Sequence, residues 1–435
     1  MSTVARRAEA TPDIGKAMYR LIERLYPICR SITGDGVRES LAIVGEHVPL
    51  QVHEVPSGTP VLDWTVPKEW NIRDAYVKDA SGRRVIDFRR SNLHVLGYSA
   101  PVRRRMSLAE LRPHLHTLPD YPDWIPYRTS YYKENWGFCL AHKALRALPD
   151  GEYEVVIDST LTDGALTYGE LVLPGEQQEE FLLSCHVCHP SMCNDNLSGI
   201  ALATFLATRL AARRARRYTY RFLFIPGTIG SITWLARNEQ AAKRVRHGLV
   251  INCVGDGGPF NYKRSRRGDA EIDRAAANVL RHCGRAHDVF DFFPYGYDER
   301  QYCSPGFDMP VGALSRTTHG HYPQYHTSAD DLGFVRPEPL AESLDLYETV
   351  IDAIEQNRRY RNLNPKGEPQ LGRRGLYGAF GAGMRSEDEM AVFWVLNLSD
   401  GEHDLLGVAE RAEMPFATIA RAAAALRDTG LLAAE

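Results

Sequence analysis

The sequence lacks several features that would assign it to a specialised class of protein. It has no unbroken run of about 18 apolar residues and no signal peptide, so we expect no membrane partner and a cytoplasmic location. A net charge of −3 offers no basic surface for nucleic acid. Internal repeats and extended low-complexity segments are also missing. These absences leave an ordinary globular protein, for which a homo-oligomer is compatible with the sequence.

Cysteine is scarce, with 8 residues in a chain of 435. A cytosolic chain of this size keeps its cysteines reduced, so we expect no disulfide framework. Cys185 and Cys188 form a Cys-x-x-Cys pair of the kind found in redox and zinc sites. There is no second such pair, and this one begins inside an apparent buried strand. We therefore interpret both cysteines as core residues.

The most informative stretch runs from Phe181 to Arg214. Residues 181–185 form a short apolar run, which is typical of a strand buried on both faces. Residues 197–214 are rich in Ala and Leu and have helical length. Between them lie His186, His189 and Asp195, at the carboxyl end of the predicted strand. In open α/β sheets that edge is where ligands bind.

Two interpretations of this polar cluster are open. His186 and Asp195 offer the nitrogen and oxygen ligands that zinc prefers. Alternatively, Asp195 caps the helix that starts near residue 197, and His186 is a hydrogen-bonded core histidine. The pair His186 and His189 is a weaker metal signal, because side chains three residues apart on a strand face opposite ways.

Beyond residue 150, strands and helices alternate, which predicts an α/β fold with a mainly parallel sheet and flanking helices. Candidate strands are 153–157, 167–173, 181–185, 218–225, 248–254 and 309–314. Candidate helices are 197–214, 231–238, 270–282, 299–301 and 340–355. Between residues 56 and 150 prolines, aromatics and short alternating runs predict an inserted β-rich domain. The core then comprises residues 1–55 and 151–362.

The C-terminal part begins with a stretch rich in Gly, Pro and Asn, so we predict a linker over residues 363–386. Residues 387–435 contain three helical patterns in a layout that suggests a winged-helix domain, normally a DNA reader. This segment has ten acidic residues and three arginines, a net charge of −7 that would repel a phosphate backbone. We therefore expect a packing or dimerisation module that binds no nucleic acid.

A second histidine segment comes late in the chain, at residues 322–331. His326 lies there in a predicted loop and can complete a His/Asp/His set with His186 and Asp195, which leaves a zinc position open for water. The alternative is that His326 is an ordinary loop residue.

Together these segments resemble the zinc aminopeptidases, whose clan also includes the glutaminyl cyclases. The hallmarks of that family are a histidine at a strand end, an Asp-Asn-x-Ser-Gly helix start and a late Tyr-His-Thr-x-x-Asp. At these places the chain has His186, Asp195-Asn196-Leu197-Ser198-Gly199 and Tyr325-His326-Thr327-Ser328-Ala329-Asp330. The segments 63–67, 127–132, 136–139 and 298–302 are more closely similar to a bacterial aminopeptidase-like branch. That branch carries an inserted β domain and a winged-helix tail, so the resemblance covers nearly the whole chain.

The chain departs from the di-zinc members of this family at two places. Gly227 and Thr228 stand where two adjacent glutamates normally serve as general base and metal ligand. Residues 252–255 carry no carboxylate where a further ligand normally follows the next strand. The remaining ligands, His186, Asp195 and His326, imply one zinc ion rather than two.

Loss of the usual glutamate leaves three functions open. The first is a mononuclear zinc-dependent, aminopeptidase-like hydrolase of an amide or peptide bond. The second is a zinc enzyme of another acyl or amide reaction in a biosynthetic pathway. The third is a degenerate protein that binds metal and ligand without turnover. The hydrolase requires a substitute for the missing general base, since a positioned general base accelerates such a reaction by roughly 10²–10⁴-fold. The candidates are Glu299, Asp298, Asp256 and His189.

The resemblance implies a small molecule or a short peptide as substrate. Arg128, Arg300, Tyr131 and Tyr325 are the candidate substrate-binding residues, since a guanidinium group binds a carboxylate bidentately. The alternative is that the tyrosines pack in the core and the arginines form structural ion pairs.

Overall fold

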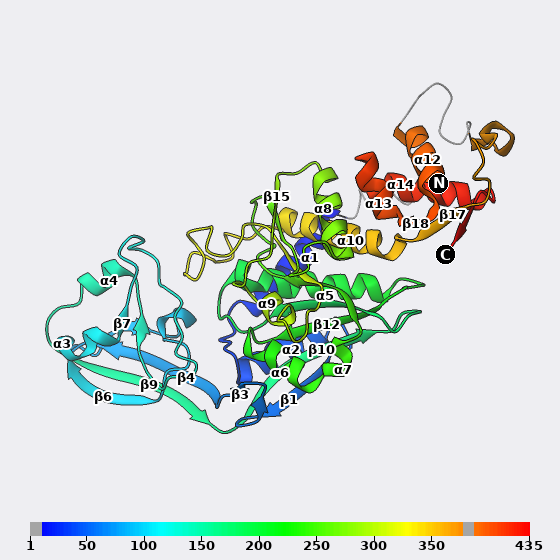
Figure 1. The fold of residues 1–435 in the computed structure, drawn as a ribbon. Helices are drawn as coiled ribbons and strands as arrows, with labels where there is room; N and C mark the ends of the chain where they lie inside the picture. The colour runs from blue at the N-terminus through cyan, green and yellow to red at the C-terminus, as the bar shows by residue number, and fades with distance from the viewer. Residues whose placement is uncertain (1–10, 377–386) are drawn as a thin grey trace.

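The computed structural model describes residues 11–376 and 387–435, and Figure 1 shows them as three parts in a row. A β-rich module lies at one end, an α/β core lies in the middle, and a small helical module lies at the other end. The candidate metal ligands belong to the core, so its sheet is described first.

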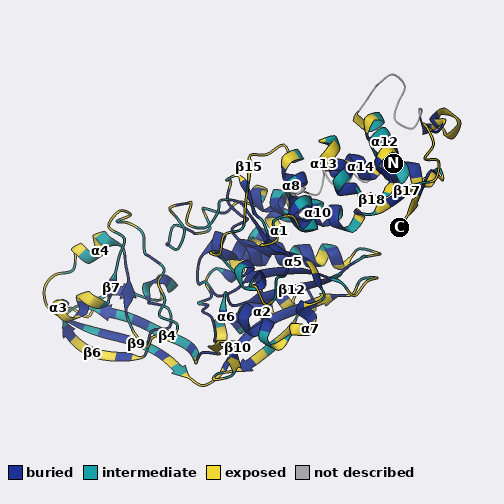
Figure 2. Ribbon diagram, viewed as in Figure 1, coloured by how far each residue is buried: buried dark blue, intermediate teal, exposed yellow. Residues whose placement is uncertain are grey.

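The core is built on an eight-stranded sheet with the strand order β1-β10-β12-β11-β13-β16-β14-β15. Neighbouring central strands run parallel, and they are β12 (Thr219–Ile225), β11 (Glu180–His186), β13 (Val245–Ile251) and β16 (Val311–Ser315). Every residue of β11 is buried, which accounts for its unbroken apolar run (Figure 2). The predicted α/β fold with a mainly parallel sheet is thus confirmed.

Near the edges of the sheet, β10 corresponds to the predicted strand 167–173, whereas β1, β14 and β15 were not predicted. On one side β1 (Gln51–Pro56) pairs antiparallel with β10 (Ala165–Leu173), which in turn pairs antiparallel with β12. On the other side lie β14 (Phe260–Lys263) and β15 (His287–Phe290), each of only four residues. A run of four residues is too short to display a reliable strand period.

Helices cover both faces of this sheet. Successive β11 side chains point to opposite faces: Phe181 and Leu183 join one hydrophobic cluster, and Leu182 joins the other. The first cluster includes α1 (Thr11–Leu25), α2 (Asp35–Gly45), α5 (Ser198–Ala211), α8 (Glu271–His282) and α10 (Pro337–Gln356). The second includes α6 (Ile229–Arg237), α7 (Glu239–Ala242) and α9 (Glu299–Tyr302). None of the helices in the described part of the chain combines the length and apolar character that a bilayer span requires.

The β-rich module is inserted between β1 and β10, since the chain leaves the large sheet after one and returns in the other. Its four antiparallel strands, in the order β5-β4-β9-β6, are β4 (Glu69–Lys78), β5 (Arg84–Asp87), β6 (Val102–Ser107) and β9 (Glu152–Thr162). Smaller elements complete it: β2 (Pro60–Val61), β3 (Trp64–Thr65), β7 (Leu115–His116), β8 (Phe138–Cys139), α3 (Leu108–Leu111) and α4 (His142–Arg146).

Strand β9 differs from its predicted place. We assigned residues 153–157 to the core, but β9 pairs with β4 and β6 along nearly its whole length. The residues of β9 show a strand pattern and do not reveal which distant strand they pair with. The module therefore extends to the end of β9, beyond the expected limit at residue 150.

The helical module contains all three predicted helices: α12 (Glu387–Leu398), α13 (Leu405–Ala412) and α14 (Phe416–Asp428). A three-stranded sheet completes it, in the order β18 (Asp400–Asp404), β17 (Arg359–Asn362) and β19 (Leu432–Ala434). Since β17 pairs with both other strands, the predicted linker over 363–386 lies within this module rather than before it. Residues 377–386 of that stretch lie outside the described residues.

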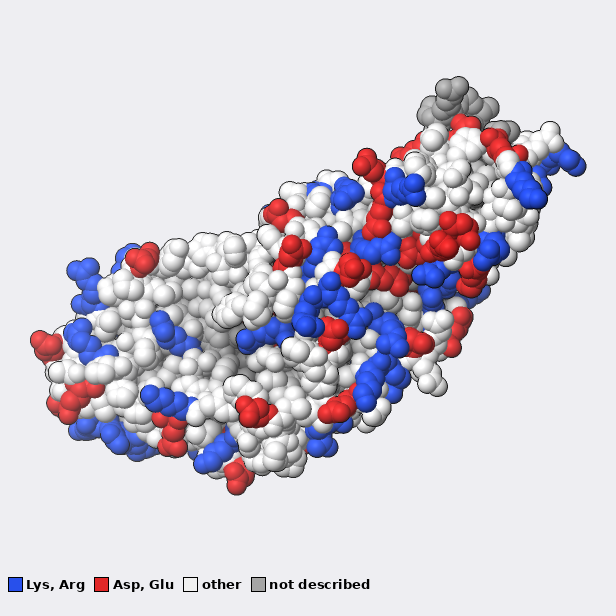
Figure 3. All heavy atoms as spheres, viewed as in Figure 1, with Lys and Arg blue, Asp and Glu red and all other residues white. Residues whose placement is uncertain are grey.

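The junction between the helical module and the core combines a continuous hydrophobic cluster with polar contacts. Asn278 of α8 donates from Nδ2 to the carbonyl oxygen of Met414 (3.1 Å) and accepts at Oδ1 from the amide of Phe416 (2.9 Å). Arg274 of α8 pairs with Asp404 (3.0 Å) and Glu410 (2.8 Å). Charges of both signs gather over this junction in Figure 3. The turn between α13 and α14 therefore packs against the core.

We expect Asn278→Ala to loosen this junction. The substitution removes both hydrogen bonds and leaves the amide of Phe416 without its side-chain acceptor, at a cost of about 1–3 kcal/mol. The measurement is the thermal unfolding midpoint together with limited proteolysis between the two parts. Arg281→Ala, at an exposed position of the same helix, is the matched control. An unchanged midpoint and cleavage pattern for Asn278→Ala would contradict the expectation.

Candidate metal centre

The candidate ligands come from three places at the carboxyl edge of the sheet. His186 is the last residue of β11. Asp195 lies in a tight turn, η3 (Cys193–Leu197), that leads into α5. His326 lies in the loop between β16 and α10. Parallel strands bring their carboxyl ends together, so residues far apart in the sequence meet at this edge.

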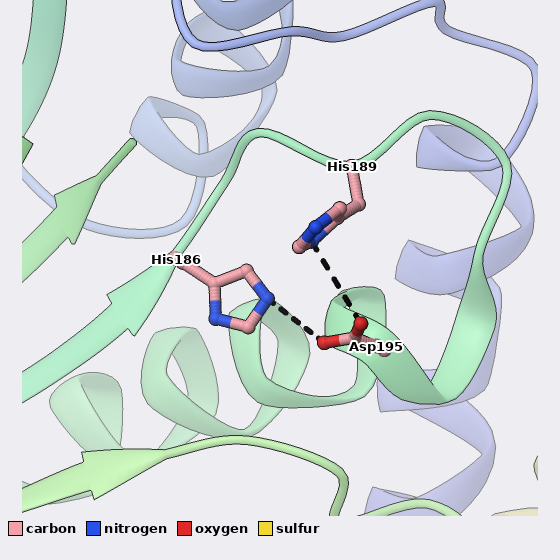
Figure 4. Close-up of side chains that lie close together, drawn as sticks. All are labelled: His186, His189 and Asp195. Atoms are coloured by element: carbon pink, nitrogen blue, oxygen red, sulfur yellow. Dashed lines mark hydrogen bonds and ion pairs between the residues drawn. The ribbon is translucent and has the colours of Figure 1, made fainter. Parts of the chain in front are cut away.

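The Asp195 carboxylate lies at the centre of the group. Its Oδ1 is 2.9 Å from Nε2 of His186, and its Oδ2 is 3.0 Å from Nε2 of His326. Nδ1 of His189 is 3.9 Å from the same Oδ2. Figure 4 shows the rings of His186 and His189 directed toward this carboxylate. The structure therefore brings together the three predicted ligands and adds His189 as a fourth.

The expectation that His186 and His189 face opposite ways does not hold. It assumed that both lie on one strand, whereas β11 ends at His186 and His189 lies in the loop that follows. His186, His189 and Asp195 offer ligand atoms within 4.8 Å of one another. His189, which we predicted as a substitute base, is thus placed among the potential metal ligands.

Three buried atoms of this group make no hydrogen bond of suitable geometry: Oδ2 of Asp195, Nδ1 of His189 and Nε2 of His326, although the first and the last lie only 3.0 Å apart. Buried polar atoms are nearly always paired, so such a convergence calls for a bound group. Two imidazole nitrogens and a carboxylate oxygen match the ligand preference of zinc. The donor set in the structure therefore fits a zinc ion.

The electrostatics favour the forms that bind metal. Burial alone would raise the pKa of the Asp195 carboxyl, but the imidazoles of His189, His186 and His326 outweigh it and hold that pKa well below its usual range. Burial holds the pKa of His189 well below its usual value, so its ring is neutral at pH 7. Ionised carboxylates and neutral imidazoles are the metal-binding forms of these groups.

Two neighbouring groups that we did not predict as site residues hold Asp195 in place. Tyr297 donates from its hydroxyl to Oδ1 of Asp195 (2.8 Å), and its ring stacks on His186 at 4.7 Å. Asp330 accepts from the backbone amides of Asn194 (2.6 Å) and Asp195 (2.9 Å). Asp330 was visible as the end of the late histidine motif. No spacing signal marks Tyr297.

A cavity of about 410 Å³ opens beside the candidate ligands. The β-rich module supplies most of its wall, and the core supplies the rest: Leu96, His116, Tyr127, Arg128, Thr129, Tyr131 and Asn135 face His189, Gly227 and His326. The two parts are joined here, since the amide of Tyr127 donates to the carbonyl oxygen of His326 (2.8 Å) and that of Ser328 to Ile125 (2.8 Å). The inserted module thus holds the loop of His326.

Of the four predicted substrate-binding residues, two line the cavity and two do not. Arg128 and Tyr131 line the cavity, and the Tyr131 hydroxyl lies 2.9 Å from that of Tyr127. Tyr325 stacks on His326, with ring centroids 3.9 Å apart. Arg300 lies over the ring of Tyr295 instead, outside the cavity wall. His116 and Asn135 line the cavity without having been predicted.

The candidate bases are also separated. Glu299 is buried in an ion pair with Lys263 (2.9 Å), and Asp256 accepts at Oδ2 from Nδ2 of the Asn194 side chain (2.9 Å). Asp298 is buried next to Gly227: a Cβ atom built on that glycine would lie 3.5 Å from Oδ1 of Asp298 and 3.2 Å from Cβ of His186. Ser231 donates to Oδ1 of Asp298 (2.8 Å), while Oδ2 has no hydrogen-bond partner. Burial raises the pKa of this carboxyl to about 6.

Comparison with known protein families shows the family to which the core belongs. Residues 19–357 match the model of a family described as a domain of unknown function, DUF4910. The chain belongs to this family. Residues 358–434 match a winged helix-turn-helix model, which confirms the predicted winged-helix module and starts it at β17.

The longer span changes the charge argument for that module. Residues 358–434 contain ten basic and ten acidic residues, so their net charge is zero. The value of −7 held only for residues 387–435. Net charge therefore does not by itself exclude DNA from the winged-helix module.

Similar proteins support the same fold. A Clostridium acetobutylicum protein named "Putative polysaccharide biosynthesis protein with aminopeptidase-like domain" is 55% identical over 433 residues, 99% of each chain. A crystal structure from the same species, described as a peptidase, is 54% identical with a TM-score of 0.95 over 99% of each chain. A zinc aminopeptidase from Bacillus subtilis is 12% identical with a TM-score of 0.58, over 78% of this chain and 94% of its own. At that identity the likeness shows the fold, and the predicted aminopeptidase-like fold is confirmed.

We expect the purified protein to bind about one zinc ion per chain, since the ligand atoms of His186, His189 and Asp195 form one group within 4.8 Å of one another. His186→Ala and Asp195→Asn should each lower the zinc content and the affinity for added zinc. Elemental analysis and zinc titration of chelator-treated protein measure both. His403→Ala, which removes a histidine of the winged-helix module, should retain the ion. A content near two ions, or retention in Asp195→Asn, would contradict this assignment.

Proposed function

We propose that this chain is a mononuclear zinc-dependent hydrolase of an amide or peptide bond, in which Asp298 replaces the missing glutamate base. His186, Asp195 and His326 would hold the ion, with His189 beside them. A zinc ion bound there would supply Lewis-acid polarisation of the scissile carbonyl. The aminopeptidase-like fold and the convergent ligand atoms support this proposal.

The observation that carries it is the place of Asp298. Its carboxylate lies against the spot where a side chain of residue 227 would begin, and Gly227 lines the cavity. Oδ1 is held by Ser231, which leaves Oδ2 free to accept a proton from the attacking water and pass it to the departing amine. Its pKa of about 6 lies close to the working range of a general base.

The other candidate bases have different roles in this proposal. Glu299 is neutralised by Lys263, and Asp256 is held by Asn194. His189 turns toward the Asp195 carboxylate. A second function, another acyl or amide reaction in a biosynthetic pathway, is favoured only by the name of the Clostridium acetobutylicum relative, which refers to polysaccharide biosynthesis.

We expect Asp298→Asn to lower the turnover of amide substrates by roughly 10²–10⁴-fold, because the amide cannot accept the proton. Zinc content should stay unchanged, since Asp298 is not among the proposed ligands. In the double variant Asp298→Asn/Gly227→Glu, a carboxylate returns from the neighbouring position and should restore part of the rate.

Glu299→Gln is the matched comparison for Asp298→Asn, because both residues are buried acids at the start of α9. If Glu299→Gln abolishes turnover while Asp298→Asn does not, Asp298 is not the base. If the wild-type protein binds zinc and turns over no amide, the chain is a binding protein.

We further propose that the winged-helix module serves packing and binds no duplex DNA. The turn before α14 is occupied by Asn278, and Arg421 and Arg427 pair with Asp388 and Asp428. We expect fluorescence anisotropy with a labelled duplex to show no binding at micromolar protein. An affinity that falls steeply as salt is added, as phosphate contacts require, would refute this.

A further inference from the structure

The cavity beside the candidate metal centre has an unusual balance of charge. Among the described residues of its wall, the guanidinium group of Arg128 is the one permanent charge, and the imidazoles of His116, His189 and His326 add no negative charge. Of the residues that line it in the described part of the chain, none is acidic. The proposed zinc ion would add two positive charges next to the single carboxylate of Asp195. The cavity is therefore built for a ligand of negative charge.

Arg128 is the cation of this wall that is free to bind a ligand. Among the described residues, no carboxylate forms an ion pair with its guanidinium group, and its side chain is exposed toward the cavity side of the module. Two other arginines of the same module are paired, Arg73 with Asp158 (2.7 Å) and Arg84 with Asp74 (2.7 Å). A guanidinium group offers two parallel N–H donors to a carboxylate or phosphate.

The backbone places Arg128 close to the metal loop. Tyr127, the preceding residue, donates from its amide to the carbonyl oxygen of His326 (2.8 Å). Arg128 in turn accepts at its carbonyl oxygen from the amide of Gly97 (2.8 Å), so both sides of the segment are held. A small ligand that fills a cavity of about 410 Å³ can therefore reach both the metal loop and Arg128.

From this arrangement we propose that the substrate is a small amide that carries an anionic group, a carboxylate or a phosphate, bound by Arg128. This inference rests on the proposed function, because it assigns the amide to the metal centre. It also separates the chain from a general aminopeptidase, whose substrates present a free ammonium group.

A free ammonium group has no counterpart in the cavity wall. Asp195 is already engaged by His186 and by the hydroxyl of Tyr297 (2.8 Å). Asp298 is buried beside Gly227, does not line the cavity wall, and in the proposed function is already engaged with the attacking water. A substrate ammonium would therefore meet Arg128 without a neutralising acid on the wall, and like charges repel. The competing outcome, an ammonium held by Asp298, is included in the test.

The test uses four probes that share an amide and differ in charge. N-acetyl-L-alanine carries a carboxylate, N-acetyl-O-phosphoethanolamine carries a phosphate, N-acetyl-L-alaninamide is neutral, and L-alaninamide carries an ammonium group. Their binding to the full chain is measured by the shift of the melting temperature and by calorimetry, with zinc-loaded and chelator-treated protein. These readouts do not depend on turnover.

We expect the two anionic probes to raise the melting temperature and the neutral and ammonium probes to leave it unchanged. The stronger of the two anions identifies the group that the site prefers. Arg128→Ala should weaken anion binding by roughly tenfold or more, since a hydrogen bond to a charged group is lost. Arg128→Lys should recover part of the affinity. Arg105→Ala, at an exposed position on β6 away from the cavity lining, should behave as wild type.

The inference is wrong if the neutral or ammonium probe binds as well as the anions, or if Arg128→Ala binds anions like Arg105→Ala. Its failure can be told apart from failure of the proposed function. Zinc binding with turnover of L-alaninamide would keep the hydrolase and overturn the anionic substrate. Arg128-dependent anion binding without turnover of any amide would keep the anion site and overturn the hydrolase.

Discussion

The buried carboxylate of Asp195 is the constraint around which this end of the sheet is arranged. An ionised carboxylate without solvent contact is stable only where donors or cations surround it. Here His186, His326 and the Tyr297 hydroxyl supply that environment, each from a different part of the chain. The strand end, the late loop and the segment before α9 must therefore meet, and the convergence that stabilises the carboxylate also forms the candidate metal centre.

The inserted β-rich module forms most of the cavity beside this centre. The central strands of the core bring the candidate ligands together, but most of the cavity wall comes from the module. Backbone hydrogen bonds between residues 125–127 and the loop of His326 hold the module against the core. Arg128 directly follows this segment. The hydrogen bonds to the loop therefore position both His326, a candidate metal ligand, and Arg128, the cationic group of the cavity.

The parts predicted from the sequence are those that local pattern determines. Residues 181–185 were long and apolar enough to identify a buried strand, and His186 and Asp195 followed from their place between that strand and a helix. Pairings between distant segments have no local sequence pattern that predicts them. Strand β9 pairs within the inserted module, and β17 pairs within the winged-helix module, so that the predicted linker lies inside that module. The orientation of His189 was predicted wrongly because this residue lies three positions beyond the end of β11, where the chain no longer follows the strand.

The missing glutamate and the position of Asp298 are best understood together. A glycine at position 227 leaves the cavity floor without a side chain, and a built Cβ would meet His186 and Asp298 at ordinary or slightly tight distances. A carboxylate from α9 therefore lies beside the place where the usual carboxylate would begin. Asp298 has a shorter side chain and comes from another element, so it leaves the wall at Gly227 open. The chain thus keeps a carboxylate beside the candidate metal centre and leaves the cavity wall at Gly227 open. If Asp298 is the base, as proposed, the exchange of one carboxylate for another also changes the room available for a substrate.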